Sequence, residues 1–132
     1  MFKSYILIFS ASLFFGYDNY QFISLPNTFL QDQNPSILIK SQSEGISNGS
    51  STSKNIFKLS FIVSENTDNF TEEDIILYNA EIISFSGKNN TYNAKFKILN
   101  KGIATVEVYG YSFTDSEGNF NKGSEQFTIF KD

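Results

Sequence analysis

Oxygen-bearing side chains gather in the polar stretch 113–123, and four of them alternate along it: Asp115, Glu117, Asn119 and Asn121. Ca²⁺ takes about six to eight oxygen ligands from carboxylates, amides and main-chain carbonyls. These four residues are therefore a candidate calcium site. Their spacing lacks the bidentate acid that closes an EF-hand loop. The alternative is an Asx-type turn, in which Asp115 and Asn119 bond nearby main-chain amides.

Two tyrosines just before this stretch form a second candidate. Tyr109 and Tyr111 share one face of an extended chain, opposite the row of Ala104, Val106 and Val108. If that row faces a core, the tyrosines point outward. Tyrosine is favoured at interfaces because it combines a large apolar ring with a polar tip. The pattern predicts a surface for a sugar or a protein; the alternative is packing on neighbouring side chains or on the N-terminal extension.

Catalytic chemistry has few candidates in this chain. Glu72, Glu73 and Asp74 are the densest acidic cluster, but adjacent residues on one turn do not supply the separated carboxylates of a glycosidase. Thr71 and Asp74 instead have the spacing of a capping box. Histidine and cysteine are absent, which removes the usual general base, the usual zinc ligands and any disulfide. We therefore expect no enzyme activity.

Composition favours a single β domain. The chain has 132 residues, of which 17% are aromatic, and Phe, Tyr, Ile and Val suit pleated, half-buried surfaces. The net charge is -4, with ten basic residues that are all lysine. Nucleic-acid binding normally needs a basic face, and none is visible in the order of the residues. We expect no nucleic-acid partner.

Period-2 alternation is clearest in Thr91–Ser112, where two alternating rows are joined at 100–102. Similar patterns indicate further strands at Pro35–Ser41, Lys54–Glu65, Ile75–Tyr78, Glu81–Ser86 and Glu125–Lys131. Seven short strands with one apolar face each must pack against another layer or close on themselves. The predicted fold class is all-β, an antiparallel β-sandwich of about seven strands.

The N-terminus has the pattern of a secretory signal. Lys3 precedes an apolar run over 5–15, which is shorter than the roughly twenty residues of a membrane span. We predict a signal peptide at 1–16 and a linker or N-terminal extension at 17–34. The alternatives are a buried apolar first strand and an uncleaved anchor. Cleavage would leave no stable membrane span and would export the protein.

Residues 35–132 resemble the bacterial Ig-like domains repeated in large surface adhesins and biofilm-associated proteins. The features that carry the resemblance run through the whole domain: Pro35, Ser64-Glu65, Phe70, Asp74-Ile75, Phe85-Ser86-Gly87, Gly102–Val108, Thr114-Asp115, Gly118-Asn119, Asn121, Phe127 and Asp132. Family members usually occur as tandem repeats, and one unit is present here.

This resemblance implies an Ig-like sandwich whose fifth and sixth strands, within Thr91–Ser112, lie in opposite sheets. It also implies an exported structural or adhesive module at the cell surface or outside the cell, with an extracellular protein or glycan as partner. Related tandem adhesins often bind Ca²⁺ near domain junctions. The alternative function is a carbohydrate- or protein-binding module on the same sandwich.

Overall fold

The computed structural model describes residues 5–9, 20–24 and 34–132, and the chain divides into two units, 1–33 and 34–132. In the first unit, β1 (Tyr5–Phe9) and β2 (Tyr20–Ser24) pair in antiparallel fashion. The predicted signal peptide and extension otherwise lie outside the described residues. The pairing adds a strand at 20–24, where the sequence shows no sustained period.

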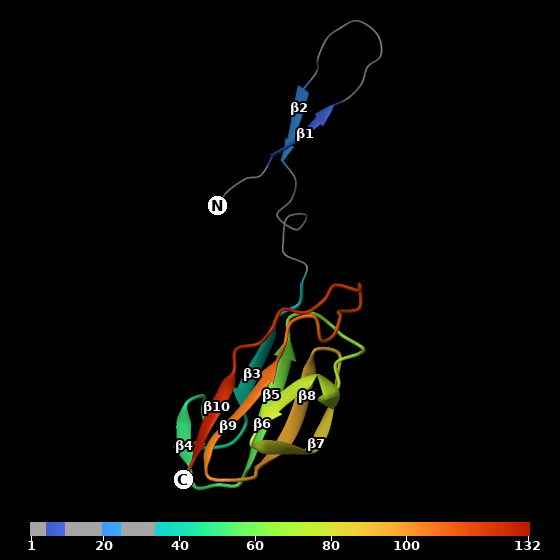
Figure 1. Cartoon of the computed structure of the whole chain (residues 1–132). Helices are drawn as coiled ribbons and strands as arrows, with labels where there is room; N and C mark the ends of the chain where they lie inside the picture. The colour runs from blue at the N-terminus through green and yellow to red at the C-terminus, as the bar shows by residue number, and fades with distance from the viewer. Residues whose placement is uncertain (1–4, 10–19, 25–33) are drawn as a thin grey trace, which may run out of the picture. The chain divides into compact units, whose positions relative to one another are not determined.

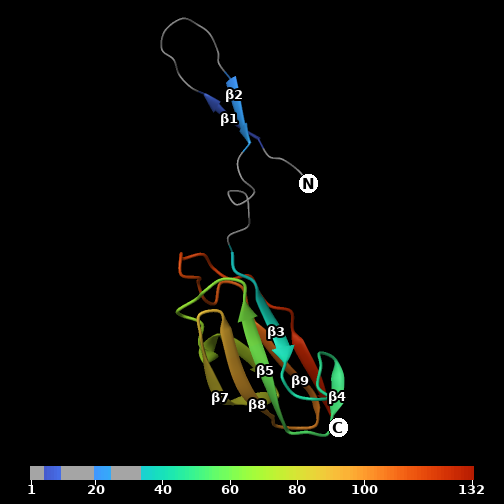
Figure 2. The same ribbon diagram turned by 180° about the vertical axis from the view of Figure 1, so that it is seen from behind.

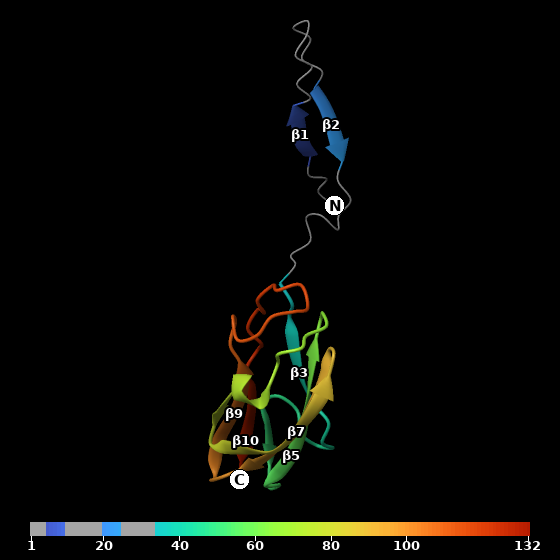
Figure 3. The ribbon, with the colours of Figure 1, turned by 90° about the vertical axis from the view of Figure 1, so that its right-hand side faces the viewer.

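The second unit is a β-sandwich, which confirms the predicted fold class (Figure 1). One layer, the β5–β8 sheet, has the order β3 (Ile37–Ser41), β5 (Ile56–Val63), β8 (Thr91–Ile98) and β7 (Ala80–Lys88). The other, the β9–β10 sheet, has the order β4 (Ser50–Thr52), β10 (Phe127–Lys131), β9 (Gly102–Val108) and β6 (Ile75–Tyr78). Figure 2 shows the β5–β8 sheet from outside, and Figure 3 shows the two layers.

One edge departs from the predicted antiparallel pattern, because β4 runs parallel to β10. The first part of the domain crosses between layers: β3 pairs with β5, and β4 then pairs with the last strand in the other sheet. Ile46, which is buried, anchors the crossing loop. Parallel pairing is possible here because β4 and β10 are far apart in the chain, whereas a tight hairpin can join only antiparallel strands.

The core is built from the alternating rows that the sequence indicates. The inward residues of the predicted strands are buried: Phe57, Leu59, Phe61, Val63, Tyr92, Ala94, Phe96, Ile98, Ala104, Val106, Val108, Phe127 and Ile129. Phe70 adds an aromatic centre, with its ring 4.9 Å from that of Phe113 and 5.0 Å from that of Tyr92. Each buried phenylalanine stabilises the fold by about 1.5–3 kcal/mol relative to an exposed one.

The stretch Thr91–Ser112 connects the two layers. β8 pairs with β5 and β7, whereas β9 pairs with β6 and β10. The prediction that its two strands lie in opposite sheets is therefore confirmed. The connecting turn is held by Asn79, whose side chain accepts the Asn100 backbone N–H at 2.9 Å and donates to the Asn100 carbonyl at 2.9 Å.

A β-bulge in β7 sets which of its side chains face the core. Ile82 pairs with Phe96 and Ser84 pairs with Lys95, so Ile83 is the extra residue. An extra residue reverses the inward–outward alternation that follows it. Phe85 therefore packs on the core, as predicted, while Ser84 and Ser86 lie on the outer face.

Candidate functional site

Three chain segments meet at the end of the sandwich where the domain begins (Figures 1 and 3). The Thr67 hydroxyl donates to the Thr114 carbonyl at 2.6 Å, and the Lys122 backbone N–H donates to the Pro35 carbonyl at 2.8 Å. The hydroxyl of Tyr92 donates to the Thr67 carbonyl at 2.9 Å, and burial and the charge of Asp68 raise the pKa of Tyr92. These bonds fix the 109–123 loop to the sandwich.

Asn121 is the buried scaffold of that loop, with a side chain that is 2% exposed. Its Oδ1 accepts the backbone N–H groups of Ser112 at 2.7 Å and Phe113 at 2.9 Å. Its Nδ2 donates to the carbonyls of Tyr109 and Lys122, both at 2.9 Å. Two accepted and two donated bonds saturate a carboxamide. The predicted metal ligand Asn121 is thus occupied in shaping the chain that carries the tyrosines.

Asp115 organises the tip of the loop. Its Oδ1 accepts the backbone N–H groups of Glu117 at 2.9 Å and Asn119 at 2.8 Å, and its Oδ2 accepts the Asn119 side-chain amide at 3.0 Å. Burial acts to raise the pKa of Asp115, but these bonds outweigh it, and the pKa is lowered from its ordinary value of 3.8. The Asx-type turn offered as the alternative to a calcium site is present.

The four predicted metal ligands are therefore arranged in two places. Asp115 and Asn119 are in contact, Glu117 joins them through its backbone N–H, and Asn121 bonds the chain at 112–113. In the part of the chain that the structure describes, no three acidic, histidine or cysteine side chains lie together as metal ligands. Calcium binding at these residues is untested, and Asp115 and Asn119 are the nearest pair of the four.

Exposed aromatic rings stand on this fixed loop. Tyr109 is 54% exposed and Tyr111 is 77% exposed, so the predicted exposure of both is confirmed. The extended strand assumed in that prediction ends earlier, because β9 stops at Val108. The ring of Tyr111 lies 5.6 Å from that of Phe120, which is 50% exposed. We call Tyr111 and Phe120 the aromatic pair. Sequence reasoning missed Phe120, although an isolated apolar residue in a polar turn was an available signal.

The backbone of Tyr111 is strained. Its φ is 62°, in the left-handed region that few residues other than glycine adopt. Its N–H donates to the Asn121 carbonyl at 3.0 Å, and Asn121 in turn fixes residues 112 and 113. A tyrosine in this region costs about 1–3 kcal/mol and persists only where surrounding bonds impose it. The loop therefore fixes the backbone position from which the Tyr111 ring extends.

The acidic cluster forms a single 3₁₀ turn over Glu72–Asp74. The Asp74 carboxylate accepts the Thr71 backbone N–H at 2.8 Å, which is the return bond expected of a capping box. The side chains of Glu72 and Glu73 are exposed. This cluster has a local structural role at the start of β6.

No family model, curated protein or solved structure matches this chain. Within the described residues, no helix has the length and apolar character needed to cross a membrane. The functional interpretation therefore rests on the residues of the 109–123 loop.

Proposed function

We propose that residues 35–132 form an Ig-like, non-catalytic module that is exported and acts by surface contact. The strand order supports this proposal. The layers β3-β5-β8-β7 and β10-β9-β6 follow the order A-B-E-D and G-F-C of a constant-type immunoglobulin sandwich, with β4 as a second segment of the first strand. Because this architecture hosts many functions, the site has to supply the role.

The observation that carries a contact role is the strained, exposed Tyr111 beside Phe120. Two aromatic rings in water gain nothing from burial, and the backbone under one of them is unfavourable. Aromatic residues are enriched at protein interfaces and among the residues that dominate binding energy. A loop whose backbone is already held also loses little backbone entropy when a partner binds.

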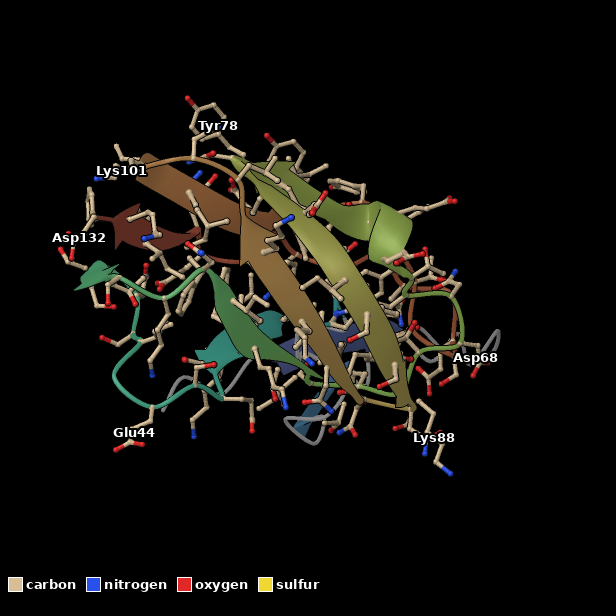
Figure 4. All side chains as sticks on the ribbon, turned by 90° about the horizontal axis from the view of Figure 1, so that it is seen from below. Glu44, Asp68, Tyr78, Lys88, Lys101 and Asp132 are labelled. Atoms are coloured by element: carbon tan, nitrogen blue, oxygen red, sulfur yellow. The ribbon has the colours of Figure 1, made fainter. Side chains whose placement is uncertain are left out.

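The test is an array of extracellular matrix proteins probed with the full chain and with two variants. Tyr111→Asn removes the ring and keeps a residue that tolerates positive φ. Tyr78→Thr is the matched control, because Tyr78 is 66% exposed on β6 and projects outward from the sandwich (Figure 4). We expect Tyr111→Asn to abolish binding that Tyr78→Thr keeps. Equal binding by both variants would count against the aromatic pair.

A carbohydrate-binding module is the second candidate, favoured by the exposure of Tyr109 in the same loop as the aromatic pair. A glycan array tests it directly. Binding of a defined sugar that is lost in Tyr109→Ala would identify this role. Binding to matrix proteins without binding to any sugar on the array would support the adhesive role instead.

Export is tested separately with residues 1–34 fused to an alkaline phosphatase that lacks its own signal. That enzyme needs disulfides, which form in the periplasm and not in the cytosol. We expect phosphatase activity from the fusion and its loss in Ile8→Lys, which interrupts the apolar run. Activity that persists in Ile8→Lys would contradict a signal of this kind.

A further inference from the structure

The outer face of the β5–β8 sheet carries a concentration of positive charge. Its four strands contain five of the ten lysines in the chain and one of the fourteen acidic residues, Glu81. Residues directly opposite one another share a face, so the pairing places all five lysines outward: Lys40, Lys58, Lys88, Lys95 and Lys97. We call this surface the lysine face; Figure 4 shows Lys88 extending away from the sandwich at its margin.

The register brings like charges together on this face. Lys58 and Lys95 are direct cross-strand partners, and like charges in this position are destabilising. Glu81 pairs with Lys97 at 3.4 Å, so the only acidic side chain of these strands is engaged at one edge. No basic face is visible in the order of the residues because these lysines come from four separate strands. Folding assembles one in a chain whose net charge is -4.

A polar network lies between the lysines. Ser60 faces outward yet is only 2% exposed. Its hydroxyl donates to Asn93 Oδ1 at 2.7 Å and accepts the side-chain amide of Gln42 at 2.5 Å. Gln42 and Asn93 line a groove of about 420 Å³, whose other polar lining residues are Lys58, Ser84, Ser86 and Lys95. The β7 bulge contributes by turning both serines outward.

We propose that the lysine face binds a linear acidic polysaccharide. Each lysine offers a compact positive charge to a sugar carboxylate. The hydroxyl and carboxamide groups of the groove can both donate and accept, which matches sugar hydroxyls. The row Lys40-Ser60-Asn93-Ser86 crosses all four strands, with neighbouring strands about 4.8 Å apart. An extended chain laid across the strands can meet the neutral groups of this row and the lysines of the row Lys58-Lys95-Ser84.

A polysaccharide fits this face better than a nucleic acid does. Single-stranded nucleic acids stack their bases on aromatic rings. The five aromatic residues of these strands are all on the core side: Phe57, Phe61, Phe85, Tyr92 and Phe96. Arginine, which grips phosphate through two parallel bonds, is absent from the chain. The site is separate from the aromatic pair, so this inference goes beyond the proposed contact role.

The experiment measures binding of the full chain to a galacturonic acid hexamer, which carries one carboxylate per sugar, and to its methyl ester. We expect binding to the acid form that weakens as salt increases, and none to the ester. The double variant Lys58→Gln/Lys95→Gln should bind about tenfold more weakly, since two exposed charge contacts are removed. Its thermal stability should hold or rise, because a like-charge pair is lost.

Two controls make the result specific. Lys54→Gln/Lys101→Gln removes the same charge from loops outside these strands and should leave binding unchanged. Asn93→Ala keeps every charge and should weaken binding to the hexamer.

Equal binding of the acid and ester forms would overturn the proposal, as would an equal loss of hexamer binding in the two double lysine variants. So would tighter binding to a DNA oligonucleotide or to phosphatidylserine vesicles than to the hexamer. Tyr111→Asn should not alter hexamer binding, which separates this test from that of the contact role.

Discussion

Asp115 makes the stability of the domain depend on pH. Three local N–H donors hold its carboxylate, and its folded pKa lies below the ordinary value of 3.8. The unfolded chain therefore takes up the proton more readily than the folded one. The stabilisation is present above the ordinary value and is lost as pH falls through the folded pKa.

We predict that Asp115→Asn removes this acid dependence. The free energy of unfolding of the parent chain, measured in urea at pH 7 and pH 3, should fall more between the two than that of the variant. Glu117→Gln is the control, because that side chain is exposed and its backbone N–H makes the bond to Asp115. If Asp115→Asn and Glu117→Gln keep the parent's acid dependence alike, the carboxylate of Asp115 is not its source.

Asp115 also allows a test of calcium binding. Three N–H donors already bond the Asp115 carboxylate, and Asn121 is saturated by the main chain. A calcium ion would compete with these donors, each of which costs free energy when left unpaired. We predict equal melting temperatures in millimolar Ca²⁺ and in EDTA. A rise with Ca²⁺ that Asp115→Asn abolishes would instead establish the site predicted from the sequence.

The β7–β8 hairpin depends on one glycine. Gly87 has a φ of 148°, and a Cβ there would lie 2.5 Å from both the Thr91 carbonyl oxygen and the Cα of Tyr92. We predict that Gly87→Ala costs about 3 kcal/mol or more, because backbone strain adds to overpacking. Gly118→Ala, at a φ of 88° with open space around it, should cost about 1–2 kcal/mol from strain alone. Urea unfolding of both variants measures the difference, and equal losses would contradict the steric argument.

At the same scale, alternation was sufficient to predict most strands and their inward faces. Phe57 to Val63 and Tyr92 to Ile98 follow period 2 within a few residues, so the signal is local. β4 carries no such signal, because Ser-Ser-Thr forms a strand only through pairing with β10 far along the chain. The bulge at Ile83 also has no signal in the sequence, because the register of β7 depends on its partner β8.

The candidate sites were also predictable only in part, where the signal lies within a few residues of the chain. The exposure of Tyr109 and Tyr111 was predicted from alternation along a strand, although β9 ends at Val108. The contact of Tyr111 with Phe120 arises from the folding of the loop. Asp115 and Asn119 lie close in sequence and were predicted together, but their bonding to backbone N–H groups was one of two alternatives. The lysine face could not be predicted, because it needs the strand order β3-β5-β8-β7.

At the scale of the whole molecule, the distribution of charge decides which ligands a surface can attract, more than the net charge of -4 does. The β5–β8 sheet has five lysines and one acid, so most acidic residues of the chain lie outside these strands. An overall acidic charge favours solubility and opposes self-association. The local basic face can still attract an anion at short range, because charges separated by more than about 8–10 Å are screened at physiological salt.

Residues 34–132 are expected to fold without the first unit. The described core residues all lie between Ile37 and Ile129, and each of the two sheets is complete within this segment. Folding a segment of this size buries well over half of its unfolded surface, enough for one core. We predict that the isolated segment 34–132 unfolds cooperatively in urea, with a midpoint close to that of the full chain. The segment 43–132 is the matched comparison, because it lacks β3, loses the pairing with β5 and removes buried Ile37. The segment 43–132 should unfold at a markedly lower urea concentration.

A different outcome would contradict this prediction. If the full chain unfolds cooperatively and the isolated segment 34–132 does not, the sandwich needs residues 1–33 to fold.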